Sequence, residues 1–243
     1  MSLAVEVVLR PIRTGNAFEE TVERLLHAIK LGVFTEGERM PAERGLAARL
    51  GVSRATLRDA IRVLEQHGYV ESRRGRTGGT FVTYRATPGS SIPDGAEEIV
   101  RSMRQPGSDL DDALTLRSVL EVGAAEAAAR RELDDGERRL LMGRLADCEA
   151  AGLAGYRQMD SRLHLAIAEV TGSPSLAAAV ADVRMRVNDL LDQIPLLTPN
   201  IDHSSAQHRA MVEAILAGDV AAARAAVPSR CSRTAALLHA FLD

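Results

Sequence analysis

The sequence predicts a mainly α-helical protein of two domains, a small N-terminal module with a β-hairpin and a larger all-helical bundle. The first observation is the charge distribution: residues 10–85 hold 14 Arg and Lys against nine Asp and Glu, whereas residues 86–243 hold 16 against 23. The second is that β-type residues gather in two short runs before residue 85. The third is that amphipathic segments rich in Ala, Leu, Arg and Glu follow from there onward.

The composition excludes several classes of protein. The chain has 243 residues, of which 46% are hydrophobic, so two domains with cores of their own are within reach. The two cysteines, Cys148 and Cys231, have no CxxC spacing, which argues against a disulfide framework or a zinc ribbon. We find no leader peptide and no apolar run of about 18 residues, so we expect a cytoplasmic protein without a membrane partner. With 3% aromatic residues and no Trp, it is a poor stacking platform for single-stranded nucleic acid.

Two helices are predicted at the start of the N-terminal module. The first runs from about residue 17 to 31. Its apolar face has helical spacing and consists of Phe18, Val22, Leu25, Leu26 and Ile29. The second lies in "MPAERGLAARLG", where Pro41 suits the first helical position and Gly51 suits the C-terminal stop. Leu46 and Leu50 supply its inward face.

A third helix is predicted directly after Gly51, with Ser53 as its N-cap. Its apolar stripe consists of Leu57, Ala60, Ile61 and Leu64. Arg54, Arg58 and Arg62 form a row beside this stripe, because residues four apart occupy one side of a helix. Two helices joined by a short turn that contains Gly are typical of a helix-turn-helix.

The row of arginines calls for an acidic partner, because like charges four residues apart mildly destabilise a helix. A helix N-terminus favours phosphate, and arginine is the best bidentate partner of guanine. Arg54 and Arg58 are therefore expected to contact DNA. The hydroxyl groups of Ser53 and Thr56 are short enough to bond a phosphate or a base. The alternative is a solvated surface with ordinary ion pairs, formed with Glu43, Asp59 or Glu65. For Arg62 both interpretations stay open.

Two short strands are predicted after the third helix, in "YVESRR" and "GTFVTY", with "GRTGG" as the tip between them. The module is then a winged helix-turn-helix, with three helices and a two-stranded wing. "GRTGGT" is also reminiscent of a phosphate-binding nucleotide loop. However, no GK[ST] follows it, and it lies in a hairpin rather than before a helix, so we reject that interpretation.

The stretch "GERMPAERGLAARLGVSRATLRDAIRVLEQHGYVESRRGRTGGTFV" resembles the winged-helix domain of GntR-type bacterial transcription regulators, and the resemblance covers residues 16–84. In that family the helix that begins in the SRxTxR segment enters the DNA major groove. The arginine of the PAER segment also contacts DNA, and the wing tip reaches the minor groove. The resemblance therefore implies DNA contacts by Arg44, Arg54, Arg58, Arg76 and Gly78.

The remaining chain divides into a linker and a helical domain. Residues 85–95, "RATPGSSIPDG", are rich in Pro, Gly and Ser and are predicted to be a linker. It separates residues 16–84 from a helical domain at 96–243, and residues 1–15 form an N-terminal extension. Amphipathic segments are predicted at about 95–104, 109–131, 134–152, 156–171, 174–194, 204–217 and 218–242. The breaks between them carry Gly172, Pro174, Pro195, Pro199 and Gly218, and Pro228 should interrupt the last helix.

Three stretches of this body resemble the ligand-binding helical domain, called FCD, of the FadR-like branch of GntR regulators. They are "LRSVLEVGAAEAAAR", "MDSRLHLAIAEVTGSP" and "QHRAMVEAILAGDVAAARAA". Each is weak alone, but their order behind a GntR-like module is specific. The resemblance implies that residues 96–243 bind an effector and form a homodimer. The β-rich effector domain and the aminotransferase of other GntR branches do not fit, because this body is too helical for the first and too short for the second.

Three residues of the helical domain form a candidate metal site. Asp160 and His164 are four apart on a helix, so both can point at one ion, and His208 lies on a later helix. A carboxylate and two imidazoles suit Zn²⁺, Ni²⁺ or Mn²⁺ and leave positions for water or a ligand carboxylate. The alternative, from the residues alone, is an ordinary acid–histidine pair on a helix surface.

The resemblance adds a fourth position to this site. Metal-binding members of the FCD group use one Asp and three His, and the fourth ligand position is occupied here by Arg230. Arginine stays protonated and cannot bind a metal. Either three protein ligands and water hold the ion, with His203 as a weak substitute ligand, or the site has no metal and Arg230 binds an acidic effector directly.

Arg117 and Glu121 lie one helical turn apart in "LRSVLE" and match positions that face the effector pocket in this family. The resemblance makes Arg117 the carboxylate anchor of the pocket. The plain alternative is an intrahelical ion pair between the two residues.

These expectations combine into a ligand-responsive transcription regulator rather than an enzyme. We expect a homodimeric repressor on a palindromic double-stranded operator, because two half-sites multiply the modest affinity of one module. A small organic acid in the helical domain would release it, and the polar set of Asp160, His164 and His208 disfavours fatty acyl-CoA. Two alternatives stay open: a metal-dependent hydrolase that uses the same three residues around zinc, and a constitutive dimeric DNA-binding protein without an effector.

Overall fold

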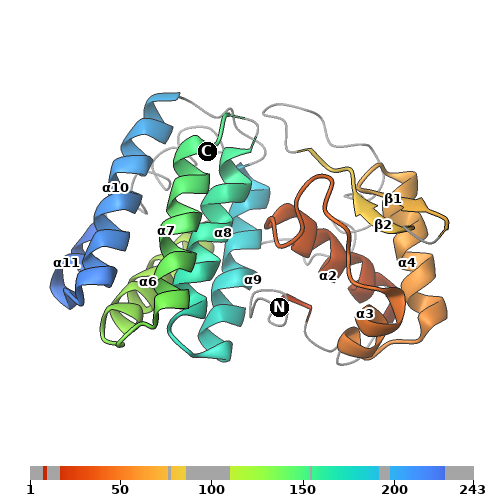
Figure 1. Ribbon diagram of the computed structural model, residues 1–243, viewed down its shortest axis with the longest axis horizontal. Coiled ribbons are helices and arrows are strands. Elements are labelled where there is room, and N and C mark those ends of the chain that lie inside the picture. Colours follow the sequence, from red (N-terminus) through yellow and green to blue (C-terminus); the bar gives the residue numbers. More distant parts are fainter. Residues whose placement is uncertain are drawn as a thin grey trace. The chain divides into compact units, whose positions relative to one another are not determined.

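The computed structural model describes residues 8–9, 17–75, 78–85, 110–153, 155–191 and 198–227, with side chains from residue 204 onward in the last range. These residues fall into two compact units (Figure 1), and each is described by itself. None of the described helices is long and apolar enough to cross a membrane. Several sequence predictions fall outside the described residues. They concern the side chains of Arg76, Arg230 and His203, the predicted linker after residue 85 and the predicted segment at 95–104. The domain boundaries stay a prediction.

The N-terminal unit is built on three helices, α2 (Ala17–Lys30), α3 (Glu43–Leu50) and α4 (Arg54–Gln66). Helix α2 packs against α4, and its predicted face is buried at Val22, Leu25, Leu26 and Ile29, whereas Phe18 is half-buried. The apolar stripe of α4 is buried as well, at Leu57, Ala60, Ile61 and Leu64. The apolar pattern therefore placed all three helices correctly.

The ends of α3 and α4 follow the cap chemistry of the sequence, with one correction. Gly51 ends α3 in the left-handed conformation at φ 67°, which glycine adopts without strain. Ser53 caps α4, because its Oγ accepts a hydrogen bond from the Thr56 N–H at 3.0 Å. Pro41 was wrongly expected at the first helical position. Helix α3 begins at Glu43 after Ala42, so Pro41 only leads the extended chain into the helix.

The wing consists of β1 (Val70–Arg73) and β2 (Gly79–Val82), which pair antiparallel with Val70 opposite Val82 and Arg73 opposite Gly79. A third segment, which the sequence analysis did not predict, borders β2. Arg39 forms an antiparallel bridge with Phe81, the Met40 N–H donates to the Thr80 carbonyl at 2.8 Å, and the Val82 N–H donates to the Glu38 carbonyl at 3.0 Å. The turn before α3 is thereby held as a short edge of the wing.

The C-terminal unit is all-helical, as predicted, within the described part of the chain. Its helices are α6 (Leu110–Ala129), α7 (Asp135–Ala150), α8 (Tyr156–Glu169), α9 (Pro174–Leu191), α10 (Thr198–Ala217) and α11 (Val220–Ala226). Helix α8 runs between α7 and α9 (Figure 1) and also packs against α6. Ten of its 14 residues are buried, so α8 is the central helix of the unit.

One boundary of this unit differs from the predictions. Pro199 was expected in a break before residue 204, but α10 begins at Thr198 and includes it. Proline is tolerated in the first turn of a helix because the N–H groups there have no intrahelical acceptor. The last predicted helix, 218–242, is described only as α11, and Pro228 lies outside the described residues.

Candidate functional site

The N-terminus of α4 is a rigid, outward-facing platform. Ser53 Oγ accepts from the Thr56 N–H and lies 2.8 Å from Thr56 Oγ1, so the two hydroxyl groups predicted to meet DNA are already joined in the cap. The apolar stripe anchors the opposite side of the helix in the core. The first turn of α4 is thus fixed in place while Arg54 and Arg58 are exposed.

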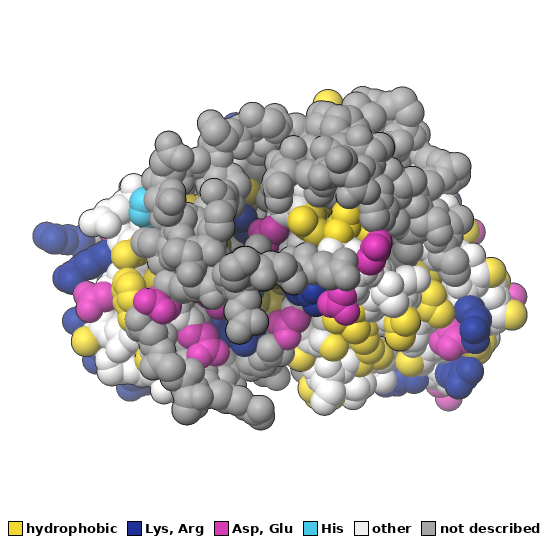
Figure 2. Space-filling view, turned by 180° about the vertical axis from the view of Figure 1, so that it is seen from behind, with side chains coloured by type: hydrophobic (Ala, Val, Ile, Leu, Met, Phe, Trp, Pro, Cys, Tyr) yellow, Lys and Arg dark blue, Asp and Glu magenta, His cyan; other side chains and the backbone are white. Residues whose placement is uncertain are grey.

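The arginines of this surface divide into paired and unpaired groups. Arg58 Nε donates to Glu43 on α3 at 2.8 Å, and Arg62 pairs with Asp59 at 3.0 Å. Arg44 and Arg54 are exposed and form no ion pair within the ranges that the structure describes. Figure 2 shows dark-blue side chains projecting from the left edge, where the N-terminal unit lies. Arg44 and Arg54 are therefore the arginines most available for phosphate or base contacts.

Gly78 closes the tip of the wing, where the sequence predicted a DNA contact. A Cβ atom at this position would lie 2.3 Å from the Arg73 carbonyl oxygen and 2.8 Å from the carbonyl carbon of Arg74. Its N–H donates to the Gly75 carbonyl at 2.9 Å. The structure thus requires glycine here for the backbone turn itself. Contact with DNA stays a prediction for Gly78.

Replacing Gly78 with alanine is expected to open the wing tip, because the colliding atoms belong to the backbone and cannot rotate away. DNA affinity should fall by about tenfold or more, with a loss of stability of about 1–3 kcal/mol. DNA titration and thermal unfolding measure both effects. Gly45→Ala is the matched control, because a Cβ there meets nothing within 4 Å. Unchanged DNA binding in Gly78→Ala would contradict the structural role of this glycine.

The C-terminal unit contains a buried polar cluster at its centre. Arg117 and Glu121 come from α6, Asp160 and His164 from α8, and His208 from α10. The structure thus brings together the two predicted effector residues and the three predicted metal ligands. Arg184 of α9, which the sequence analysis did not name, completes the cluster and is 2% exposed.

Asp160, His164 and His208 present three ligand atoms to one point. Asp160 Oδ1 lies 2.9 Å from His208 Nε2 and 3.7 Å from His164 Nε2, and the two Nε2 atoms are 3.3 Å apart. Ligands at about 2.1 Å from a metal, at angles of about 90–120°, are themselves about 3.0–3.6 Å apart. The three atoms therefore fit the first coordination shell of a divalent ion.

Each of the three predicted ligands also has a polar neighbour on its outer side. Arg184 donates to the other oxygen of Asp160, Oδ2. Glu121 Oε1 lies 4.0 Å from Nδ1 of His164, and Cys148 Sγ lies 3.8 Å from Nδ1 of His208. Outer partners of this kind set the tautomer of an imidazole and the direction of a carboxylate. The three inner atoms are thus left facing one another.

Glu121 and Arg184 connect the predicted metal ligands to the predicted carboxylate anchor. Glu121 Oε1 accepts from Arg117 Nε at 3.0 Å and from Arg184 Nη1 at 2.5 Å. The intrahelical pair of Arg117 and Glu121 is therefore real, but it is buried and shared with a third residue. One feature of the sequence could have indicated that Arg184 is buried. It keeps helical spacing with Val180, Ala181, Val187 and Asn188, which lie on the buried face of α9.

Comparisons with known proteins identify the family of this chain. The model described as "Bacterial regulatory proteins, gntR family" matches residues 18–82, and the FCD domain model matches residues 112–229. A protein of Escherichia coli (strain K12) named as an L-lactate dehydrogenase operon regulatory protein is 32% identical over 235 residues, with 93% of this chain and 86% of that protein covered. The chain belongs to the GntR family of bacterial regulatory proteins. Its FCD domain supports the FadR-like branch.

Two further comparisons fit this family assignment. An HTH-type regulator named RmpR, of Mycobacterium gastri, is 36% identical over 164 residues; the chain spans 56% of the length of that relative. The solved structure of Escherichia coli McbR/YncC has a TM-score of 0.55 at 18% identity and covers 95% of this chain, which shows a shared fold. As a GntR regulator with an FCD domain, the protein is a ligand-responsive DNA-binding transcription regulator.

Proposed function

We propose that this GntR-family regulator is a homodimeric repressor, released from a palindromic operator when a small carboxylate binds at the polar cluster of its FCD domain. The DNA contacts are assigned to Arg44, Ser53, Arg54, Thr56 and Arg58, with Arg76 and Gly78 at the wing tip. A dimer gains affinity because both modules engage half-sites at once. The effector lowers DNA affinity only if it binds the DNA-free arrangement more tightly.

One observation supports the effector site: two buried guanidinium groups each have an N–H donor without an acceptor in the described chain. Arg117 Nη1 and Arg184 Nε are buried and make no hydrogen bond within the described chain. A buried donor without an acceptor costs about 1–3 kcal/mol, so such donors are expected where a bound ligand supplies the acceptor. Both arginines bond the same oxygen of Glu121, so their guanidinium groups lie close together. The two oxygens of an effector carboxylate can accept one charge-assisted hydrogen bond from each guanidinium group.

Asp160, His164 and His208 are assigned to a divalent ion such as Zn²⁺, Ni²⁺ or Mn²⁺, held with water in the remaining positions. When bound, the ion would supply an acceptor site for an effector carboxylate. Arg184 fits this arrangement because it holds Asp160 by Oδ2 and leaves Oδ1 to the ion. Arg230 is assigned to the effector rather than to the metal.

A hydroxy acid suits a site that joins a metal to guanidinium groups, because its hydroxyl and carboxylate can chelate together. The relative named for the L-lactate dehydrogenase operon makes L-lactate the first compound to test. The alternative of a metal-dependent hydrolase is not favoured. It needs a general base, and Glu121, the remaining carboxylate of the cluster, has Oε1 occupied by Arg117 and Arg184.

The function is tested with an operator selected from a random DNA pool. Purified full-length protein with zinc is titrated onto it, with and without L-lactate and related hydroxy acids. An effector should weaken DNA binding by about 5–150-fold, the usual range of such coupling. His208→Ala should lose the bound zinc, measured by elemental analysis, and lose the response while it still binds the operator.

Arg209→Ala is the matched control, because Arg209 is the next residue of α10 but pairs with Glu149 on the surface at 2.8 Å. It should keep both zinc and response. A response that survives in His208→Ala without zinc would contradict the metal assignment. A DNA affinity that no carboxylate changes would contradict the effector proposal and favour a constitutive DNA-binding protein.

A further inference from the structure

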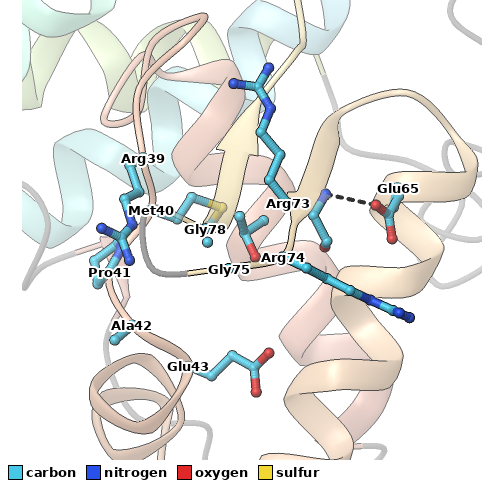
Figure 3. Close-up of a pocket in the computed structure, with 13 residues that line it drawn as sticks. Arg39, Met40, Pro41, Ala42, Glu43, Glu65, Arg73, Arg74, Gly75 and Gly78 are labelled. Atoms are coloured by element: carbon cyan, nitrogen blue, oxygen red, sulfur yellow. Dashed lines mark hydrogen bonds between the residues drawn. The ribbon is translucent and has the colours of Figure 1, made fainter.

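A hollow of about 520 Å³ lies between the start of α3 and the wing of the N-terminal unit. One wall is the chain from Arg39 to Glu43, and the other is the wing around Arg73, Arg74 and Gly78 (Figure 3). The sequence analysis assigned no role to Arg39, to Arg74 or to this space. The hollow is continuous with the predicted DNA surface, because Glu43 at its rim binds Arg58 of α4 at 2.8 Å.

The charges that line the hollow leave an excess of positive charge. Both lining carboxylates are engaged: Glu43 pairs with Arg58, and Glu65 Oε1 accepts from the Ser72 N–H at 2.7 Å. Arg73 pairs with Glu71 at 3.0 Å. Arg39 and Arg74 are exposed and have no carboxylate partner among the residues that the structure describes. The lining thus holds three arginines against two carboxylates, and Arg39 is the guanidinium that an anionic ligand finds without a carboxylate partner.

The backbone of Arg39 is fixed by the wing, and its side chain starts from this fixed position. Its backbone belongs to the edge segment of the wing through the bridge to Phe81, and the Met40 N–H donates to the Thr80 carbonyl at 2.8 Å. Its side chain lies over Gly79, where a Cβ atom would come within 2.5 Å of Arg39 Nε.

We propose that this hollow seats the phosphate backbone of one DNA strand, with Arg39 as its principal cation. The occupant is a duplex phosphodiester because the hollow is cationic, is lined by exposed arginines and lies beside the surface of α4. The first turn of α3, whose N-cap Ala42 has no capping side chain, adds N–H groups that favour phosphate. Figure 3 shows Arg74 extending to the side opposite Arg39. Phosphate contacts of this kind fix register and carry no sequence information.

The experiment measures how DNA binding depends on salt. Full-length Arg39→Gln is titrated onto the selected operator and onto a scrambled duplex at about 50–200 mM KCl. Each lost phosphate contact is expected to lower the slope of log affinity against log salt by about one per protomer. Affinity should fall several-fold, by the same factor on both duplexes. Arg39→Lys keeps the charge and should keep most of the slope.

Arg85→Gln is the matched control, because it removes one exposed charge from the same unit outside the hollow. Arg85 is bound by Glu36 at 2.7 Å and lowers the pKa of that carboxyl. The slope of log affinity against log salt for Arg85→Gln should match that of the unchanged protein. Equal slopes for Arg39→Gln and Arg85→Gln would overturn the proposal, as would equal losses in Arg39→Lys and Arg39→Gln. A loss confined to the operator would also overturn it, since Arg39 would then read a base. None of these readouts depends on the effector or the metal.

Discussion

Replacing Arg184 with methionine is expected to lower the free energy of unfolding of the metal-free protein by about 3–5 kcal/mol, the range for breaking a buried ion pair. Arg184 is 2% exposed and is the cation that Glu121 and Asp160 share. Methionine fills much of the volume but leaves the carboxylates short of a counter-charge. Glu121 keeps the guanidinium of Arg117, and Asp160 keeps the imidazole of His208 at 2.9 Å and that of His164 at 3.7 Å. Denaturant unfolding of the full chain measures the loss.

Arg186→Met is the control for this experiment. Arg186 lies two residues further along α9 and pairs with Asp112 at 2.9 Å, but that pair is at the surface. Exposed pairs contribute about 0–1 kcal/mol, so the control should be nearly neutral. Equal losses in the two variants would show that Arg184 is not the charge that holds the cluster together. The comparison isolates the effect of burial, because both variants replace an arginine of α9 with methionine.

Replacing Arg54 with alanine is expected to weaken specific DNA binding by about 1–3 kcal/mol and to relax the base preference at one position of each half-site. Arg54 is exposed in the first turn of α4 and has no ion pair to break within the described chain. Its loss therefore acts on the DNA complex rather than on the fold. Titrations with single-base variants of the operator measure both effects, and Arg62→Ala is the control.

Arg58→Ala should differ from Arg54→Ala in a way that the structure makes specific. Arg58 neutralises Glu43, so its removal leaves an unpaired carboxylate beside the DNA surface. The loss of affinity should then be partly restored in the double variant Arg58→Ala/Glu43→Gln. Specific affinity that stays unchanged in Arg54→Ala and Arg58→Ala would contradict the assignment of α4 as the recognition helix. A normal thermal unfolding curve for each variant shows that a change in DNA affinity does not come from a loss of folded protein.

The sequence by itself determined those features that arise within a few residues of one another. Helical spacing of apolar residues placed α2, α3 and α4, and Ser53 and Gly51 marked a helix start and a helix end because caps are local hydrogen-bond arrangements. The wing followed from two β-type runs around a glycine-rich tip. The four-residue spacing of Asp160 and His164 placed both on one side of α8. Such features are set by backbone geometry alone.

Only the tertiary structure decided which distant side chains meet. It brought His208 to Asp160 across 48 positions of sequence, joined Arg184 to Glu121, and paired Arg58 with Glu43 instead of leaving it free. It also turned the chain at Arg39 into an edge of the wing. From the sequence alone, an arginine on a helix is expected to face solvent, because burying its charge costs free energy. The two carboxylates from α6 and α8 that offset this cost for Arg184 are neighbours only in the folded unit.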